Sequence, residues 1–225
     1  MQPTYLPWLG YYEMMAQSDV FVLFDDVQYV KKSWHQKNRI KSAAGELVLV
    51  VPVKTSGARF QKINEAFIDN AQDWKKKHLK SILLNYAKAP FFNQYKEDLR
   101  RIYTASYRKL IEVDVAIIDF LKTQLRINTP IVLSSTIAAR DGRNEKIIDI
   151  CRYVNADVLY DTKGAIDIIN VQQLSDSGLK VMFQEYNHPE YSQQHGKFIP
   201  YLSVLDLLLN QGERSLEIIL SGSKR

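Results

Sequence analysis

Short apolar runs alternate with segments of helical periodicity along the chain, and this alternation restricts the fold more than any other feature. Runs of apolar residues bounded by polar or turn-forming residues are typical of buried strands. Five such runs are predicted strands: 19–24, 46–53, 130–133, 157–160 and 180–183. Strands that alternate with helices favour a parallel sheet built from βαβ units. We therefore expect an α/β fold.

Residues 71–125 have helical spacing instead. Trp74, His78, Ile82 and Tyr86 recur every four residues, and two further periodic segments follow a break at Ala89 and Pro90. These segments predict a helical insertion at about 71–126 within a single α/β domain spanning 1–225. Further helices are expected in these places: near Glu13, 144–154, 171–177, 202–209 and 215–220. Residues 27–40 are polar, aromatic and basic, which predicts a functional loop.

Composition excludes several classes of protein. The 225 residues are 46% hydrophobic, which is typical of a globular chain, and no apolar run approaches the roughly 20 residues of a membrane span. The first residues have neither the basic region nor the cleavage site of a signal peptide. A single cysteine, Cys151, supports no disulfide framework. We expect a cytoplasmic protein.

The net charge of +5 is modest, with 30 Lys and Arg against 25 Asp and Glu. Basic clusters occur at 31–41 and 75–80, and in predicted helices they favour solvated faces. Nucleic-acid binding would require these clusters to share one continuous surface, so it is the less favoured interpretation. Anionic small molecules, including nucleotides and sugar nucleotides, remain compatible with this charge. Oligomeric state is not predicted.

The first twelve residues contain two prolines and three tyrosines before a predicted helix. Prolines restrict the backbone, and Gly10 permits close approach of a ligand or a helix. Gln2, Tyr5, Gly10 and Tyr11 are therefore candidate binding residues, because polar aromatic side chains suit ligand stacking. They suit a packed N-terminal turn equally well.

Two acids follow the first predicted strand, at the position where ligands meet parallel sheets. Adjacent strand residues point to opposite faces, so we expect one of Asp25 and Asp26 to face a site. Such a carboxylate can orient an amine, bind a sugar hydroxyl or act as a general base; a turn or capping acid is the alternative. Downstream candidates supply stacking, amide and guanidinium groups: Gln28, Trp34, Asn38 and Arg39, with His35 less favoured.

A polar aromatic segment follows the last predicted strand. Its candidate binding residues are Gln184, Tyr191 and Gln194, whose side chains suit a polyol or sugar. His188 is a candidate for proton transfer because Pro189 restricts its backbone. A histidine satisfied by structural hydrogen bonds is the alternative. Asp206 lies in an apolar helix, where it is either paired or facing the site.

Several chemistries lack support. The four histidines show no spacing with acids that indicates a metal site, so none is predicted. Walker and Gly-x-Gly-x-x-Gly loops are missing, as is Gly-x-Ser-x-Gly. Cys151 lies in an apolar helix and is expected in the core.

Taken together, several segments resemble the WbqC-like family: Gln2–Tyr12, Phe24–Gln28, Trp34–Ile40, Val181–Gln184, Asn187–Tyr191 and Phe198–Asn210. The resemblance covers nearly the whole chain. It implies a bacterial protein of O-antigen or lipopolysaccharide gene clusters, for which a glycine-transferase role has been proposed.

A second likeness concerns nucleotidylyltransferases and class I synthetases. Pro3–Tyr11 has the layout of their loop-to-helix signature, although Pro7 or Trp8 and Tyr11 stand where histidines would contact ATP. Ser134, Ser135 and Thr136, followed by Arg140, resemble their Ser-Ser-Thr-x-x-Arg element. These serines suit anion binding or a helix cap. The order of the two motifs implies a Rossmann-like, nucleotide-binding parallel sheet.

These observations predict an enzyme that attaches glycine, another amino acid or an acyl group to a sugar or sugar nucleotide during surface-polysaccharide synthesis. Asp25 and His188 are the candidate catalytic residues. The cofactor is unknown, and ATP with magnesium, which would activate a carboxylate, is the candidate to test. The rival hypothesis is a non-catalytic protein that binds a sugar nucleotide or scaffolds other enzymes. Convergence of Asp25, Asn38 and His188 on one pocket would favour the enzyme.

Overall fold

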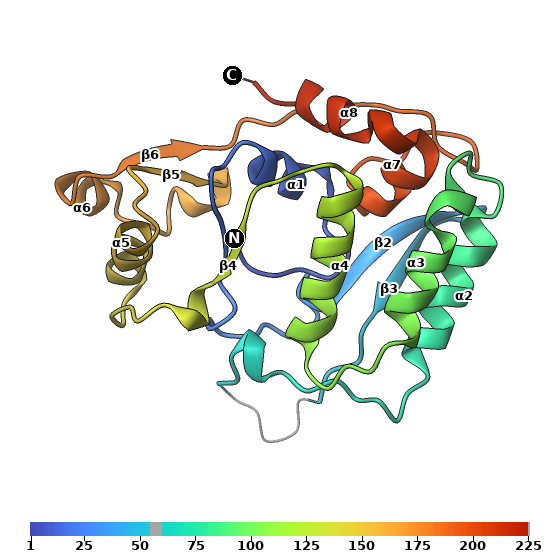
Figure 1. Ribbon diagram of the computed structural model, residues 1–225, viewed down its shortest axis with the longest axis horizontal. Coiled ribbons are helices and arrows are strands. Elements are labelled where there is room, and N and C mark those ends of the chain that lie inside the picture. Colours follow the sequence, from blue (N-terminus) through green and yellow to red (C-terminus); the bar gives the residue numbers. More distant parts are fainter. Residues whose placement is uncertain (55–59, 225) are drawn as a thin grey trace.

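The computed structural model describes residues 1–54 and 60–224, and its elements alternate along the chain (Figure 1). The strands are β1 (Phe21–Leu23), β2 (Lys37–Ser42), β3 (Gly45–Val50), β4 (Ile131–Leu133), β5 (Val158–Asp161) and β6 (Lys180–Phe183). The α-helices are α1 (Leu9–Ala16), α2 (Trp74–Tyr86), α3 (Phe92–Thr104), α4 (Leu110–Gln124), α5 (Arg143–Tyr153), α6 (Val171–Asp176), α7 (Val204–Gln211) and α8 (Ser215–Ser221). The mixed α/β prediction is confirmed.

The described strands form three separate two-stranded sheets. β1 pairs with β4 in parallel, and β5 pairs with β6 in parallel. β2 and β3 form an antiparallel hairpin. Parallel pairing of the predicted strands is therefore confirmed only within pairs, and the larger Rossmann-like sheet stays a prediction.

Met1 lies beside β1, on the strand edge that β4 leaves free. Its ammonium donates to the Val22 carbonyl at 2.9 Å, and its carbonyl accepts from the Phe24 N–H at 2.8 Å. Burial lowers the pKa of this ammonium, and the charge of Asp161, the last residue of β5, opposes that shift. Among the described strands, β1 and β5 do not pair directly.

Two local expectations differ from the structure. β2 begins at Lys37, inside the segment expected to be a loop, because Asn38 and Ile40 alternate inward while Lys37 and Arg39 are less buried. α1 begins at Leu9 rather than near Glu13. Apart from Glu13 its residues are apolar or aromatic on every side, so it lacks a helical period, and almost the whole helix is buried.

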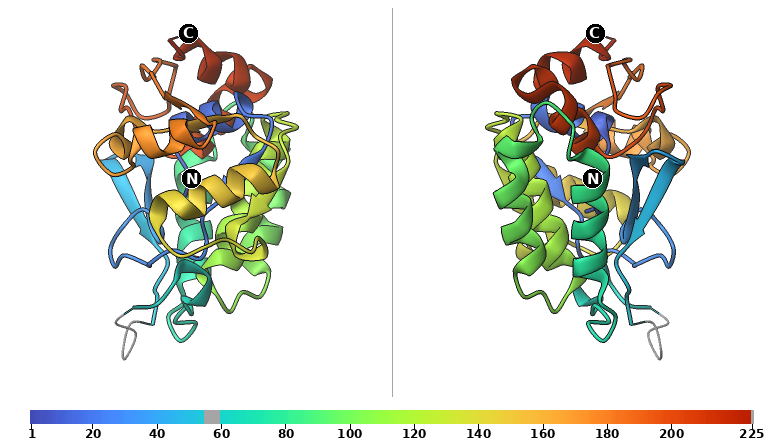
Figure 2. Two further views of the ribbon diagram at one scale, coloured as in Figure 1. Left: turned by 90° about the vertical axis from the view of Figure 1, so that its left-hand side faces the viewer. Right: turned by 90° about the vertical axis from the view of Figure 1, so that its right-hand side faces the viewer.

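The three predicted helices between residues 71 and 125 are confirmed as α2, α3 and α4. They pack side by side, and the β2–β3 hairpin lies next to α2 (Figure 2). Their buried positions follow the predicted period, for example Trp74, His78, Ile82 and Tyr86 on α2. None of the helices in the described ranges combines the length and apolar character that crossing a bilayer requires.

Two hydrophobic clusters hold these elements. The larger cluster joins α1, α2, α3, α4 and α7 with the hairpin. The smaller one lies between α5, α6 and the β5–β6 pair and contains Ile147, Cys151 and Leu174. Cys151 is therefore a core residue as expected, and burial raises its thiol pKa to about 11. At the carboxyl end of β1, Leu23 belongs to the larger cluster and the next residue, Phe24, packs against the smaller one.

Candidate functional site

The carboxyl ends of β1 and β4 bring together predicted acids and predicted hydroxyls. Asp25 follows β1 and is only 1% exposed. Its Oδ1 accepts from the Ser135 N–H at 2.9 Å and from the Ser134 hydroxyl at 3.2 Å. Its Oδ2 accepts from the Ser135 hydroxyl at 2.6 Å and from Asn64 Nδ2 at 3.2 Å. Asp25 therefore ties β1 to the turn that follows β4.

Asp26 forms an ion pair with Lys146 of α5, and its other oxygen accepts from the Ser134 hydroxyl. The Asp26 and Lys146 side chains remain 17% and 18% exposed. Burial alone would raise the pKa of Asp26, but the Lys146 and Ser134 hydrogen bonds and the ammonium charge bring it below its ordinary value. Asp26 is thus a carboxylate at neutral pH. We call Asp26 and Lys146 the acid–lysine pair.

Both acids contact Ser134, so the expectation that only one of them faces a shared site does not hold. The strand ends at Leu23, and the alternation of side chains that applies within a strand stops there. Asp25 and Asp26 therefore share the Ser134 hydroxyl as a hydrogen-bond donor, and each acid has further partners of its own.

The four residues assigned to a nucleotide are engaged within this chain. The hydroxyls of Ser134 and Ser135 donate to the two acids, and that of Thr136 donates to the Leu133 carbonyl at 2.8 Å. The Arg140 guanidinium donates two hydrogen bonds, each 2.8 Å long, to the Asp149 carboxylate. Those bonds, together with one from the Arg140 N–H, hold the pKa of Asp149 at about 2.

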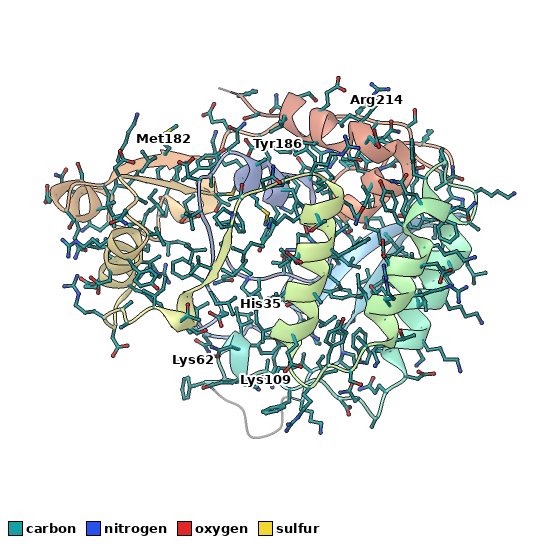
Figure 3. The ribbon with its side chains drawn as sticks, viewed as in Figure 1. His35, Lys62, Lys109, Met182, Tyr186 and Arg214 are labelled. Atoms are coloured by element: carbon teal, nitrogen blue, oxygen red, sulfur yellow. The ribbon has the colours of Figure 1, made fainter. Side chains whose placement is uncertain are left out.

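In the N-terminal loop Gln2 is exposed, and its Oε1 accepts from Nε2 of the buried His35 at 2.8 Å. His35 is 4% exposed and is labelled in the interior of the molecule in Figure 3. Its Nδ1 accepts from the Val30 N–H at 3.4 Å, which fits a neutral ring. Burial lowers the pKa of His35 to about 4. His35 therefore holds the loop in place.

Asn38 of β2 supports the same loop. Its Nδ2 donates to the carbonyls of Leu6 at 2.6 Å and Tyr5 at 3.2 Å. The Tyr5 hydroxyl in turn contacts His78 Nδ1 at 2.8 Å and the Tyr103 hydroxyl at 2.5 Å. Asn38, predicted from a different segment than Gln2 and Tyr5, thus contacts the loop that contains them.

Arg39, Trp34 and Gln28 lie further out. Trp34 is 49% exposed, and the Arg39 guanidinium sits 5.4 Å from its ring centroid. Arg39 also pairs with Glu46 at 2.9 Å and donates to the Tyr201 carbonyl at 3.0 Å. Gln28 forms an isolated bridge with Lys62. Trp34 and Arg39 thus offer an aromatic and cationic surface to solvent.

Gln184 connects β6 with α1. Its Nε2 donates to Glu13 Oε2 and to the Gly10 carbonyl, both at 2.7 Å. Glu13 is fully buried and also accepts from the Ser223 hydroxyl at 2.7 Å. The close approach predicted at Gly10 is made by a tryptophan, since a Cβ there would lie 2.3 Å from the Trp8 ring.

His188 lies in an aromatic cluster. Its ring is 5.0 Å from Tyr201 and 6.3 Å from Trp8, centroid to centroid, and the Trp8 contact is stacked. Within the described chain its buried Nε2 has no hydrogen-bond partner, and burial lowers its pKa. Tyr191 stacks on His188 and donates to Asp206 Oδ2 at 2.9 Å. Gln194 donates to the Lys88 carbonyl at 3.4 Å.

Asp25, Asn38 and His188 therefore belong to three different groups of contacts. Asp25 contacts the turn after β4, Asn38 contacts the N-terminal loop, and His188 contacts the aromatic cluster. The arrangement combines a partly exposed acid–lysine pair with a separate aromatic surface.

The chain was compared with known proteins, and the WbqC-like protein family model matches residues 2–218. The chain belongs to the WbqC-like family. It is also 31% identical, over 214 residues, to the uncharacterized protein Rv1507c of Mycobacterium tuberculosis, covering 94% of this chain and 92% of that protein. No solved structure matches.

This WbqC-like chain also has candidate site residues that sequence analysis missed. Lys146 and Asn64 complete the groups around Asp26 and Asp25, and Glu13 anchors Gln184. Lys146 sits in an amphipathic helix, where a lysine carries no distinctive signal. Glu13 was detectable as an acid inside an otherwise apolar segment.

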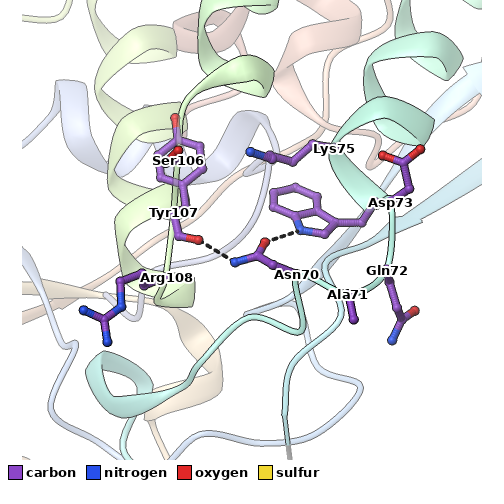
Figure 4. A pocket seen from close by; sticks show the side chains of 9 residues that line it. Asn70, Ala71, Gln72, Asp73, Lys75, Ser106, Tyr107 and Arg108 are labelled. Carbon is purple, nitrogen blue, oxygen red and sulfur yellow. Dashed lines mark hydrogen bonds between the residues drawn. The ribbon is translucent and has the colours of Figure 1, made fainter.

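A cleft of about 440 Å³ lies before α2 and α4, away from the residues predicted as a site (Figure 4). Asn70 spans it, accepting from Trp74 Nε1 at 3.2 Å and donating to the Tyr107 carbonyl at 2.7 Å. Lys75 and Arg108 supply positive charge at its rim. Among the described residues, no group of three or more His, Cys, Asp or Glu side chains is placed to hold a metal ion.

Proposed function

We propose that this protein is a transferase that attaches glycine, another amino acid or an acyl group to a sugar or sugar nucleotide in bacterial surface-polysaccharide synthesis. The acid–lysine pair carries this proposal, because it combines a carboxylate and an ammonium at the carboxyl ends of two parallel strands. Both groups keep some exposure, so a ligand can reach them.

The pair can perform two roles in such a transfer. Lys146 can bind the phosphate of a sugar nucleotide or a donor carboxylate. Asp26, ionised at neutral pH, can orient the attacking hydroxyl or amine and accept its proton as the new bond to the acyl carbon forms. The bond between that carbon and the activating group of the donor breaks in the same transfer, which releases the group as the CoA thiol from an acyl-CoA or as AMP from an acyl-adenylate. Asp25 and Ser134 would position Asp26 rather than react.

ATP with magnesium remains the candidate for activating the donor. Ser134, Ser135 and Arg140 contact carboxylates of this chain, an arrangement that fits support of the acids better than binding of phosphates. No step is therefore assigned to ATP, and the chemistry proposed for Asp26 and Lys146 holds for any activated acyl donor.

The test is a transfer assay read by mass spectrometry. The purified protein is incubated with nucleotide sugars and either glycine with ATP and magnesium, or an acyl-CoA. We expect one nucleotide sugar to gain the mass of one acyl group, and Lys146→Met to lose at least tenfold of that rate. Lys163→Met is the control, since Lys163 makes an exposed ion pair with Glu185. Equal rates for both variants would contradict the proposal.

A non-catalytic sugar-nucleotide-binding or scaffold protein is the second candidate. The separation of Asp25, Asn38 and His188 favours it, as do the aromatic rings around His188. Under this hypothesis the same nucleotide sugars quench tryptophan fluorescence in a saturable way, and none changes mass. Binding that survives Lys146→Met but is lost in Tyr201→Ala would favour this candidate over the transferase.

A further inference from the structure

The cleft before α2 and α4 has the size of a small-molecule site. Its volume is about 440 Å³, and pockets that bind small molecules usually span about 300–1,000 Å³. Two hydrogen bonds hold its walls together: Asn70 Nδ2 donates to the Tyr107 carbonyl at 2.7 Å, and the Ile68 N–H donates to the Arg108 carbonyl at 2.9 Å. Most of the lining residues are exposed, so a ligand can enter without any opening of the core.

Lys75 places a positive charge on the α2 side of the cleft. Its side chain extends towards the opposite wall (Figure 4), where the ammonium donates to the Ala105 carbonyl at 2.6 Å. An ammonium has three N–H donors, so two remain for a ligand. Lys75 forms no ion pair with any described residue, so its charge is held in place but not neutralised.

Arg108 places a second positive charge on the wall before α4. Its main chain is fixed, because its N–H donates to Glu112 Oε2 at 2.6 Å and its carbonyl accepts from Ile68. The side chain is exposed, and within residues 1–54 and 60–224 its guanidinium has no hydrogen-bond or ion-pair partner. A guanidinium matches the paired oxygens of a phosphate or a carboxylate. The two walls thus supply one available cation each.

Asp73 and Ser106 add uncommitted hydrogen-bonding groups to the two walls. Both line the cleft, and in the described part of the chain neither side chain has a hydrogen-bond partner. A carboxylate repels an anion but accepts hydrogen bonds from hydroxyl groups, so Asp73 suits an uncharged, hydroxyl-bearing part of a ligand. A bare inorganic anion would also leave most of the cleft unfilled.

We propose that this cleft binds a small hydroxyl-bearing anion, such as a polyol phosphate or a sugar acid. Its phosphate or carboxylate group lies between Lys75 and Arg108. Its hydroxyl groups contact Asp73 and Ser106. The inference does not depend on the proposed transferase activity, because neither residue of the acid–lysine pair lines the cleft.

The experiment is a thermal-shift titration of the full chain at constant ionic strength. Glucose 6-phosphate and glucuronate are the anionic probes, and glucose and inorganic phosphate are the comparison compounds. We expect a saturable rise in Tm with at least one anionic probe, because a ligand that binds only the folded chain stabilises it. The larger response decides between phosphate and carboxylate. No rise with either probe, or an equal rise with glucose or inorganic phosphate, would overturn the proposal.

Variants assign the shift to the cleft. Lys75→Met and Arg108→Met should each weaken the apparent affinity by about tenfold, the effect of losing one hydrogen bond to a charged group. Lys76→Met is the matched control, because Lys76 is the next residue of α2, is exposed and does not line the cleft. Equal losses in Lys75→Met and Lys76→Met would show a general effect of charge and overturn the proposal.

Lys146→Met separates this site from the acid–lysine pair, where an anion could also bind. We expect this variant to keep the shift. A shift that is lost in Lys146→Met but unchanged in Lys75→Met and Arg108→Met would assign the anion to the acid–lysine pair and overturn the proposal for the cleft. A failure to detect transferase activity would change none of these outcomes.

Discussion

Asp206 shares its carboxylate oxygens between tyrosine hydroxyls from two distant parts of the chain. Tyr86 donates to Oδ1 at 2.7 Å and Tyr191 donates to Oδ2 at 2.9 Å. Of the two readings that the sequence left open for Asp206, the structure supports structural pairing. Burial raises the pKa of Asp206, and the hydrogen bonds and nearby Lys41 oppose that rise. The network connects α2, the C-terminal loop and α7.

Replacing Tyr86 with phenylalanine should disrupt this network and destabilise the protein. The variant loses the bond to Asp206 and the acceptor for the Lys41 N–H, which lies 2.9 Å away. We expect the free energy of unfolding to fall by about 1–3 kcal/mol, the cost of leaving a buried polar group unsatisfied. Urea denaturation measures this, with Tyr153→Phe as the exposed control. Equal stability of the two variants would contradict the described hydrogen bonds.

Asp114 should make stability depend on pH. Burial raises its pKa well above the ordinary 3.8, so the folded protein holds this proton more tightly than the unfolded chain does. Stability from this group is present below pH of about 3.8 and is lost as pH rises towards the folded pKa. Asp114→Asn escapes that loss.

We therefore expect the Tm of Asp114→Asn, relative to the wild type, to increase from acidic to neutral pH. Thermal unfolding at a series of pH values measures the difference. A difference that stays constant, or that favours the wild type as pH rises, would show that Asp114 is not buried as a lone acid.

At the scale of elements, the loop-to-helix segment depends on the absence of a side chain at Gly10. A Cβ there would meet the Trp8 ring at 2.3 Å, and Trp8 packs on Tyr186, His188 and Tyr201. Gly10→Ala should destabilise the protein by about 1–3 kcal/mol, the usual cost of overpacking. It should also shift tryptophan emission.

Gly164→Ala is the control for this prediction, since its nearest neighbouring atom would be 3.7 Å from the added carbon. Urea denaturation with fluorescence detection reports both effects. Indistinguishable midpoints for the two variants would argue against the close packing of Trp8 on α1.

Local patterns predict most elements because the period of a helix or strand is visible among residues only a few positions apart in the sequence. The confirmed helices α2, α3 and α4 have such a pattern, with one face buried. α1 is buried on nearly every side, so no helical period in the sequence marks the residue at which it begins. β2 was not predicted because nearly all of its residues are polar, so its alternation between buried and partly exposed positions does not appear as an alternation of apolar and polar residues.

At the scale of the whole molecule, long-range partners decide the site. Asp25 and Ser135 were both predicted, from strand-end and hydroxyl motifs, and they do meet. Their meeting required β1 and β4 to pair across more than one hundred intervening residues, which include the β2–β3 hairpin and the helices α2, α3 and α4. Lys146 could not be predicted as a site residue, since nothing local distinguishes a lysine whose partner is supplied by another element.

The acid–lysine pair carries the proposed function, and a double-mutant cycle on it is the most direct test. Transfer rates are measured for Asp26→Asn, Lys146→Met and the double variant, with circular dichroism to confirm folding. If the pair acts as one group, each single variant loses most of the activity and the double variant loses little more. Losses that multiply, or single variants with full activity, would show that Asp26 and Lys146 do not carry the transfer together.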